Sequence, residues 1–285
     1  MYTDSFFKSH QSLNCRGKLL SLEKPLVMGI LNITPDSFYD GGRNYTHHQS
    51  LVHARQMLQE GADIIDIGAM STRPGAAIIS EEEEKSRLLP VLESLREEFP
   101  DAVLSVDTFR ATIARMSVDA GADIINDVSG GMQDPQMFKT IADLKVPYIL
   151  MHMQGSPADM QKNPQYHNVV KDIGVFFTRQ LEELRAYGVH DIILDPGFGF
   201  GKTLQHNYQL LKGLPFFQMF ELPLLVGVSR KSMVTKLLDL SPENALNGTT
   251  ALHVLALERG ANILRVHDVQ HAKQVVRIIE QVNRV

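Results

Sequence analysis

Short apolar runs alternate along the chain with longer amphipathic segments, and this alternation is the strongest structural signal in the sequence. Eight apolar runs have the length of strands and lie at 26–32, 63–68, 103–107, 123–127, 146–152, 191–195, 224–228 and 262–266. Segments between them have the length of helices, as at 81–99, 109–120 and 169–187. Strands that alternate with helices pair in parallel, because each helix returns the chain to the same end of the sheet. The pattern therefore predicts an α/β fold.

A weak internal repeat supports this architecture. The segment Gly61-Ala-Asp-Ile-Ile-Asp-Ile-Gly68 resembles the segments 121–126 and 260–265 and, more loosely, 188–195. In each copy a glycine closes an amphipathic helix, which favours a left-handed C-cap. A strand rich in branched residues follows and ends in a polar residue. The repeat predicts that one helix–glycine–strand unit recurs around the fold.

Polar residues at the strand ends favour one arrangement of the eight strands over another. They are Asn32, Asp66, Asp107, Asn126, His152, Asp195, Ser229 and the pair Arg265 and His267. Eight such ends fit a closed (β/α)8 TIM barrel with one active face, whereas an open doubly wound sheet usually has fewer strands and one dominant switch point. We therefore predict a single barrel domain over residues 1–285, with the barrel proper at 25–285.

The segment before the first barrel strand predicts a small additional element. An Arg16-Gly17 turn lies between two arms that contain leucines, so residues 1–24 are expected to form an extension with a hairpin that closes the bottom of the barrel. Two helices, at about 230–238 and 243–258, are expected between the last two strands. No linker or shift in composition marks a second domain.

Composition narrows the class of protein. The 285 residues, 44% of them hydrophobic, suffice for one barrel of about 250 residues. A net charge of −5 argues against a nucleic-acid binder, although a small anionic ligand needs only local positive charge. The single Cys15 excludes an internal disulfide. Neither a signal peptide nor an apolar run of about 20 residues is present, so we predict a cytoplasmic protein without a membrane partner.

Two basic motifs predict sites for anions. Ser229-Arg-Lys-Ser232 joins the seventh strand to a helix, and cations at the positive end of a helix indicate an external anion. At the end of the eighth strand, alternation places Arg265 and His267 on the same side of an extended segment, where they can hold one phosphate. The alternative for the second motif is an exposed strand end.

Three further strand ends predict a site for a ligand. Asp195-Pro-Gly-Phe-Gly-Phe-Gly-Lys-Thr203 is not a P-loop, because the first glycine of that motif would fall at Pro196. We interpret it as a flexible loop that presents Asp195 and one or both phenylalanines to a ligand. Asp107 and Asn126 end adjacent strands and can converge on one heterocycle. The alternatives are that Asp195 only caps backbone amides and that Asp107 caps a helix.

Two loops have the composition of lids. Ser71-Thr-Arg-Pro-Gly75 follows the second strand, and its Thr72 and Arg73 can bind an anion as the loop closes. A solvated turn is the alternative. The first strand ends in Asn32, and the loop 34–42 that follows is rich in hydroxyls, carboxylates and glycines.

Met151, at the end of the fifth strand, can pack on a bound ring or simply fill the core.

Six of these motifs, in order along the chain, resemble the dihydropteroate synthase family. The first is Asn32-Ile-Thr-Pro-Asp-Ser-Phe38, and the last is the Arg-x-His-Asp run at 265–268. The resemblance implies a pterin-binding TIM barrel that joins (7,8-dihydropterin-6-yl)methyl diphosphate to p-aminobenzoate, with Mg2+ as cofactor and a homodimer as the assembly. One departure is present, because Ala69-Met70 stands where the family commonly has Gly-Glu.

The resemblance also implies a role for each site residue. The pterin ligands would be Asp107, Asn126, Met151, Asp195, Phe200 and Lys231. The pyrophosphate ligands would be Asn32, Thr72, Arg73, Arg265 and His267, with Asn32 also holding Mg2+. The p-aminobenzoate ligands would be Phe38, Pro74, Lys231 and Ser232. The residues expected to carry catalysis are Asp40, Arg73, Asp107, Asp195 and Lys231.

The expected mechanism is a dissociative substitution, in which pyrophosphate leaves before the neutral amine attacks. A pterin-dependent methyltransferase domain is the main alternative, but it should lack the Ser-Thr-Arg-Pro-Gly loop, the Ser-Arg-Lys helix start and the Arg-x-His pair. A second alternative is a paralogue that binds pterins without turnover, which only the Ala69-Met70 departure favours.

Overall fold

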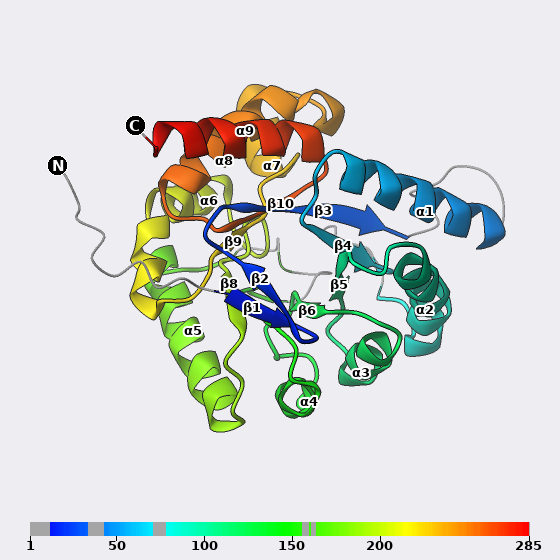
Figure 1. Cartoon of the computed structure of the whole chain (residues 1–285). Coiled ribbons are helices and arrows are strands. Elements are labelled where there is room, and N and C mark those ends of the chain that lie inside the picture. The colour runs from blue at the N-terminus through cyan, green and yellow to red at the C-terminus, as the bar shows by residue number, and fades with distance from the viewer. Residues whose placement is uncertain (1–11, 34–42, 71–77, 156–159, 161–163, 285) are drawn as a thin grey trace.

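Eight parallel strands and the helices around them form the body of the molecule (Figure 1). The computed structural model describes residues 12–33, 43–70, 78–155, 160 and 164–284. The strands are β3 (Leu26–Asn32), β4 (Ile64–Gly68), β5 (Val103–Asp107), β6 (Ile124–Asp127), β7 (Tyr148–Met151), β8 (Ile192–Asp195), β9 (Leu225–Val226) and β10 (Ile263–Val266). The helices are α1 (Arg43–Gln59), α2 (Glu81–Glu98), α3 (Ala111–Asp119), α4 (Met137–Leu144), α5 (Val169–Ala186), α6 (Leu204–Lys212), α7 (Ser232–Leu238), α8 (Leu246–Glu258) and α9 (Val269–Val282), with short 3-10 turns at Leu214–Phe220 and Pro242–Asn244.

The sheet closes on itself. Its strand order is β8-β7-β6-β5-β4-β3-β10-β9, and a parallel bridge between Leu194 and Leu224 joins the two ends. The Leu194 amide donates to Pro223 O at 2.8 Å, which reinforces this junction. All eight predicted strands are therefore present, and the predicted barrel is confirmed. The strand β9 is shorter than predicted because the chain leaves the ladder after Val226.

The glycines of the internal repeat have the predicted geometry. Gly61, Gly121, Gly188 and Gly260 have φ values of 95°, 112°, 81° and 94°. These left-handed conformations end the helix before each strand. Glycine occupies the position because a residue with a Cβ adopts such a conformation only at a cost. The repeated turn thus starts four of the eight barrel strands at the same end of the barrel.

The N-terminal hairpin covers the bottom of the barrel, as predicted. Strands β1 (Ser12–Cys15) and β2 (Lys18–Ser21) pair in antiparallel fashion around Arg16 and Gly17, whose φ values of 53° and 87° are those of a type I′ turn. Leu13 and Cys15 are 2% exposed. They pack against residues near the starts of the barrel strands, namely Leu26, Met28, Ile64, Ile124, Ile149, Ile193, Leu225 and Ile263. Figure 1 shows the hairpin near the centre of the view.

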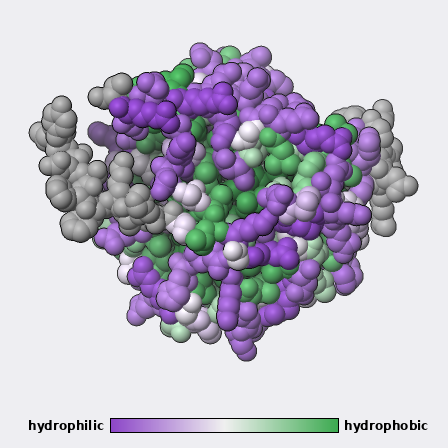
Figure 2. Space-filling model, in the orientation of Figure 1, coloured by the Kyte–Doolittle hydropathy of each residue, from purple (hydrophilic) through white to green (hydrophobic). Residues whose placement is uncertain are grey.

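Most of the hydrophobic core lies between the strands and the surrounding helices. Strand residues that point outward, such as Val27, Ile65 and Leu104, pack there with helix residues such as Leu88 and Val276. Figure 2 shows a mainly hydrophilic rim on the hairpin side, with hydrophobic atoms toward the middle of that face. The assignment of the whole chain 1–285 to one domain stays a prediction.

Candidate active site

The polar strand ends lie at one level of the barrel because the strands are in register. Asn32 pairs with Gly68, Gly68 with Asp107, and Asp107 with Asn126. On the other side of the ring, Met151 pairs with Asp195. Side chains from five strands therefore meet at the C-terminal mouth, which is where TIM barrels hold their active sites.

Arg265 lies at the centre of this cluster. Its Nε donates to Asp66 Oδ2 at 2.7 Å, and its Nη2 lies 3.3 Å from Asp107 Oδ2. The Arg265 side chain is 16% exposed, and both carboxylates are buried. In this structure the guanidinium contacts two buried carboxyl groups, so its environment is not that of a free surface cation.

Asp66 is a residue to which the sequence assigned no role beyond that of a polar strand end. It is fully buried and also accepts from Ser105 Oγ at 2.6 Å and from Asn126 Nδ2 at 3.0 Å. The available signal was its place in the internal repeat, where the copy at 121–126 ends in Asn126. Local sequence could not show that both residues meet across the mouth.

Asp107 does not cap a helix. Helix α3 begins at Ala111 with Arg110 as its N-cap, and it is Thr108 Oγ1 that accepts from the Arg110 amide at 3.2 Å. The capping alternative for Asp107 is therefore wrong. Burial raises the pKa of Asp107 to about 8, against the opposing attraction of Arg265. A carboxyl group held near its titration point inside a cluster is typical of a functional site.

Asp195 has one oxygen engaged by the protein and one that is not. Its Oδ1 accepts from the Gly197 amide at 2.7 Å, so the capping alternative is right for that oxygen. For Oδ2 the described part of the chain provides no hydrogen bond. Burial raises the pKa of Asp195, and the nearby Lys231 ammonium opposes this shift. The carboxylate can thus accept hydrogen bonds from a ligand at Oδ2 while Oδ1 keeps its hydrogen bond from the Gly197 amide.

Buried Lys202 holds the loop that follows Asp195. It is 2% exposed, and its Nζ lies 2.8 Å from Gly197 O, 3.0 Å from Phe200 O and 3.1 Å from His152 Nδ1. Gly197 has φ = 70°, and a Cβ there would lie 1.9 Å from His152 O. The loop was expected to be flexible, but in this structure it is wrapped around the side-chain nitrogen of Lys202.

Lys231 reaches across to the same loop. Its Nζ donates to Phe198 O and lies 4.5 Å from the centre of the Phe200 ring, in cation–π geometry. Burial lowers the pKa of Lys231 to about 8, although Asp195 attracts the charged form. Ser232, the first residue of α7, is exposed.

The neighbouring Arg230 departs from the expected role of an anion-binding cation. Its Nε and Nη2 donate to Asp268 Oδ2 and Oδ1 at 3.0 and 2.6 Å. The anion that compensates this cation is therefore part of the protein. Sequence alone could not show this pairing, because the two residues are 38 positions apart.

An apolar cluster forms one wall of the mouth. Its buried members are Met70, Phe109, Val128, Met151, Met160 and Phe200. Met151 and Phe200 therefore lie together, as expected of residues that flank a ring. Met70, at the position where the family commonly has a glutamate, is 7% exposed and packs in this cluster. The departure replaces a carboxylate with a thioether that needs no polar partner.

Asn32 and His267 lie at the rim. A Cβ built on Gly68 would lie 3.7 Å from Asn32 Oδ1 and 3.8 Å from Asp107 Oδ2, so these two oxygens flank the glycine. His267 is exposed, and its Nδ1 lies 3.1 Å from Ser229 Oγ. Arg265 lies on β10 and His267 directly follows that strand, but their partners differ: carboxylates for Arg265, and the hydroxyl of Ser229 for His267.

Five of the predicted site residues lie outside the described part of the chain. They are Phe38, Asp40, Thr72, Arg73 and Pro74. Their roles therefore stay predictions. Within the described part, no group of three or more His, Cys, Asp or Glu residues is arranged to hold a metal ion.

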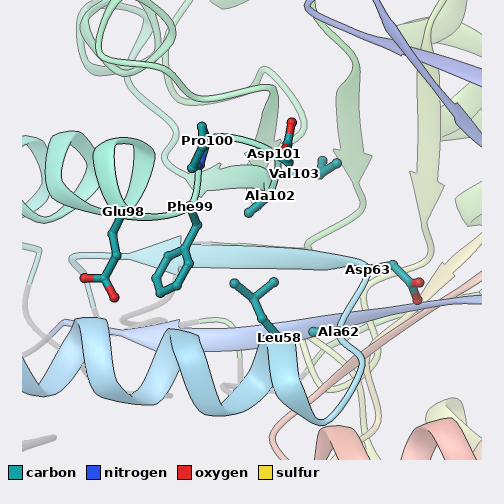
Figure 3. Close-up of a pocket in the computed structure, with 9 residues that line it drawn as sticks. All are labelled: Leu58, Ala62, Asp63, Glu98, Phe99, Pro100, Asp101, Ala102 and Val103. Carbon is teal, nitrogen blue, oxygen red and sulfur yellow. The ribbon is translucent and has the colours of Figure 1, made fainter.

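A pocket of about 470 Å³ at the opposite end of the barrel does not belong to this site. It is lined by the end of α1, the segment after α2 and the starts of β4 and β5 (Figure 3). Its three carboxylates already have cationic partners: Asp63 pairs with Lys273, Asp101 with Lys18, and Glu98 with Arg55. The convergent, partly unpaired polar groups are at the mouth.

Comparison with known proteins places this geometry in a family. A model of pterin binding enzymes matches residues 28–267. The dihydropteroate synthase of Escherichia coli (strain K12) is 45% identical over 270 residues, which cover 94% of this chain and 95% of that protein. The chain belongs to the dihydropteroate synthase family. The Haemophilus influenzae member is 43% identical over 268 residues, covering 93% of this chain and 97% of that protein.

Solved dihydropteroate synthases share the fold closely. The Yersinia pestis enzyme with a sulfonamide drug complex has a TM-score of 0.91 and 48% identity, over 96% of this chain and 100% of that one. The Xanthomonas albilineans enzyme with 4-aminobenzoic acid has a TM-score of 0.91 and 41% identity, over 97% and 100% of the two chains. These findings confirm the resemblance and favour a synthase over a pterin-dependent methyltransferase. In the described part of this family member, no helix is long and apolar enough to cross a membrane.

Proposed function

We propose that this member of the dihydropteroate synthase family makes 7,8-dihydropteroate for folate biosynthesis. The enzyme is a transferase: it condenses (7,8-dihydropterin-6-yl)methyl diphosphate with p-aminobenzoate and releases pyrophosphate. The observation that carries the proposal is the convergence of Asp107, Asn126, Asp195 and Lys231 beside an apolar wall at the barrel mouth. The Xanthomonas albilineans relative in complex with 7,8-dihydropteroate, with a TM-score of 0.87, 38% identity and coverage of 96% and 100%, supports it.

The pterin is proposed to bind by its donor-rich edge. A 2-amino-4-oxo ring presents amino and ring N–H groups along one edge, and a carboxylate can accept two parallel hydrogen bonds. Asp107, Asn126 and Asp195 each have one side-chain oxygen without a hydrogen bond in the described part of the chain. Lys231 supplies a donor for acceptor atoms of the pterin. Met151 and Phe200 lie in the apolar wall, where they can pack on a face of the ring.

The diphosphate is proposed to bind at the rim of the mouth. Arg265 and His267 would meet it from the end of β10, and Thr72 and Arg73 would meet it from the loop after β4. Asn32 would hold Mg2+, because one carboxamide oxygen together with phosphate oxygens and water suits that ion's preference for hard oxygen ligands. Bound Mg2+ would supply positive charge that stabilises the leaving group.

The reaction is proposed to be dissociative. The C–O bond to the diphosphate breaks first, and the diphosphate leaves with the electron pair while Arg265 and Arg73 neutralise its charge and Thr72 and His267 donate hydrogen bonds to it. Asp107 and Asp195 stabilise the pterin methylene cation. The neutral amine of p-aminobenzoate then forms the C–N bond and loses a proton to water, so no strong base is needed.

The second substrate is proposed to bind between the pterin and the two loops. Its carboxylate would meet Ser232 and Lys231 at the start of α7, and Phe38 and Pro74 would enclose its ring. Asp40 would act from the same loop as Phe38. These two loops would exclude water from the site during the reaction.

A homodimer in the cytoplasm is proposed as the working form. Exposed apolar side chains gather on the adjacent helices α7, α8 and α9, and they are Leu237, Leu238, Leu255, Ile278 and Val282. Such a surface on packed helices suits contact with a second copy of the chain. We expect Ile278→Asp to shift the protein from dimer to monomer in sedimentation velocity, whereas Leu19→Asp on the hairpin leaves the mass unchanged.

One assay tests the proposed activity. Pyrophosphate release from the dihydropterin diphosphate should depend on p-aminobenzoate and should be inhibited by a sulfonamide. A paralogue without turnover would bind the pterin but release no pyrophosphate. Release that is independent of p-aminobenzoate would indicate hydrolysis instead and would refute the proposal.

A further inference from the structure

We propose that Asp66 is the positioning residue of the pterin site, which orients the Asn126 carboxamide and fixes the Arg265 guanidinium before a ligand arrives. The inference rests on the proposed function, because it concerns how the same site recognises its pterin. Asp66 itself touches no ligand in this proposal. It acts through two side chains that do.

Asp66 connects strands that lie on both sides of β4 in the sheet. It lies on β4 and accepts hydrogen bonds from Ser105 on β5, Asn126 on β6 and Arg265 on β10. Its side chain is fully buried, so an unpartnered charge here would be costly. Three donors, one of them the Arg265 guanidinium, supply the partners that this buried carboxylate needs. The carboxylate is therefore the fixed point to which two proposed ligand-binding residues are attached.

The bond to Asp66 leaves Asn126 only one orientation of its amide. Nδ2 lies 3.0 Å from Asp66 Oδ2 and donates to it. A flipped amide would place Oδ1 against that carboxylate, acceptor to acceptor. In the described part of the chain, Asn126 Oδ1 itself has no hydrogen bond. The oxygen must then face the mouth, where it accepts hydrogen bonds from the N–H groups of a ligand and cannot donate.

The same carboxylate sets the direction of Arg265. The bond from Nε to Asp66 Oδ2 holds the guanidinium at its inner end, while Nη2 reaches Asp107 Oδ2 at 3.3 Å. An arginine held in this way has fewer rotamers to lose when its outer nitrogens meet a diphosphate. Without Asp66 the cation would have only Asp107, which is itself a proposed pterin ligand.

The test compares Asp66→Asn with the matched control Ser105→Ala. The control removes one hydrogen bond from the same carboxylate but leaves Asn126 and Arg265 attached to it. By isothermal titration calorimetry, Asp66→Asn should weaken binding of 6-hydroxymethyl-7,8-dihydropterin by about tenfold or more, because a hydrogen bond to a charged group is lost. Ser105→Ala should weaken it by about threefold or less.

A double-mutant cycle separates positioning from general damage to the fold. In an Asn126→Ala background the amide no longer needs orienting, so Asp66→Asn should cost clearly less pterin affinity than it does alone. Equal losses in both backgrounds would overturn the proposal, since Asp66 would then act independently of Asn126. Wild-type pterin binding is measured first: its absence would refute the proposed function, whereas wild-type binding that Asp66→Asn leaves unchanged would refute this inference alone.

A measurement on the unmodified protein covers the case in which Asp66→Asn fails to fold. The two side-chain amide protons of Asn126, assigned by their loss in Asn126→Ala, should give sharp, distinct and slowly exchanging NMR signals in the ligand-free protein. Addition of the dihydropterin should leave the signal of the proton bonded to Asp66 largely in place. Averaged or rapidly exchanging signals in the ligand-free protein would show that the amide is not held, and would overturn the proposal.

Discussion

At the scale of single residues, the site contains more buried carboxyl groups than nearby cations. Asp66 and Asp107 both pair with Arg265, and Lys231 is the cation that interacts most strongly with Asp195. Burial raises the pKa of Asp107 and of Asp195, and Arg265 and Lys231 oppose these two shifts. The protein's own carboxylates therefore compete with a ligand's phosphates for Arg265.

This competition leads to a prediction for Arg265→Ala. The variant should weaken binding of the dihydropterin diphosphate much more than binding of the bare 6-hydroxymethyl-dihydropterin, because only the diphosphate loses a charge-assisted contact. A difference of about tenfold or more is expected between the two losses. Titration calorimetry of both ligands measures it, and comparable losses would contradict the assignment of Arg265 to the diphosphate.

The pH dependence of pterin binding should follow Asp107 and Lys231. Burial raises the pKa of Asp107 from its ordinary 3.8 to about 8. Between these values the fold retains a proton that the unfolded chain releases, so this group's contribution to stability falls as pH rises. Ligand N–H groups need the ionised form. Pterin affinity should therefore rise with pH up to about 8, and decline above it as Lys231, with its pKa also lowered to about 8, loses its charge.

Calorimetry in two buffers of different ionisation enthalpy checks this prediction. Below about pH 8, binding to the wild-type protein should release a proton. In Asp107→Asn the rise in affinity and the proton release should both disappear, while the decline at high pH remains. A wild-type affinity that is constant from mildly acidic to mildly basic pH would contradict the role of Asp107.

At the scale of elements, the loop after β8 is built around Lys202. The Lys202 side-chain nitrogen donates to two carbonyls of its own loop and lies within hydrogen-bond distance of His152, which directly follows β7. Burial lowers the pKa of Lys202 well below its ordinary value. Burial lowers the pKa of His152, which favours the neutral ring that can accept a hydrogen bond. The loop in turn supplies the amide that supports Asp195 and the carbonyl that accepts from Lys231. Loss of the Lys202 side-chain nitrogen should therefore disturb two proposed pterin ligands, Asp195 and Lys231, at once.

We predict that Lys202→Met weakens pterin binding by about tenfold or more and lowers stability by about 1–3 kcal/mol, because several buried acceptors lose their donor. Lys212→Met, an exposed change in the following helix, is the control and should have no measurable effect on either. Calorimetry and urea denaturation measure the two quantities. Pterin affinity that Lys202→Met leaves at the wild-type level would show that the loop holds its shape without the Lys202 side-chain nitrogen.

At the scale of the whole molecule, the two ends of the barrel have separate tasks. The mouth gathers polar groups for a ligand, whereas the bottom is sealed by the hairpin with Leu13 and Cys15 against the strand starts. Burial raises the pKa of the Cys15 thiol to about 12, so this thiol stays protonated and inert. Stability and recognition are thus located at opposite ends, as is usual for this fold.

This separation predicts that damage at the bottom lowers stability without changing recognition. Leu13→Ala should cost about 2–5 kcal/mol of unfolding free energy, as for other buried leucines. Leu19→Ala, on the exposed side of the hairpin at 74% exposure, should cost little. Chemical denaturation measures both. Pterin affinity of the folded Leu13→Ala protein should match the wild type, and a parallel loss of affinity would show that the two ends are coupled.

The sequence by itself determined the barrel, because strand and helix periodicity and the repeated C-cap glycines are local properties of the chain. It also identified the residues of the mouth, since a polar residue directly after a buried strand must emerge at the strand's end. Only the tertiary structure decided which of these groups meet. The pairings Asp66–Arg265 and Arg230–Asp268 span 199 and 38 positions, and the wrapping of a loop around Lys202 depends on His152 from another strand. A charge in a sequence has no partner until the fold closes, and the partner decides whether that charge binds a ligand, holds a neighbour or stays protonated.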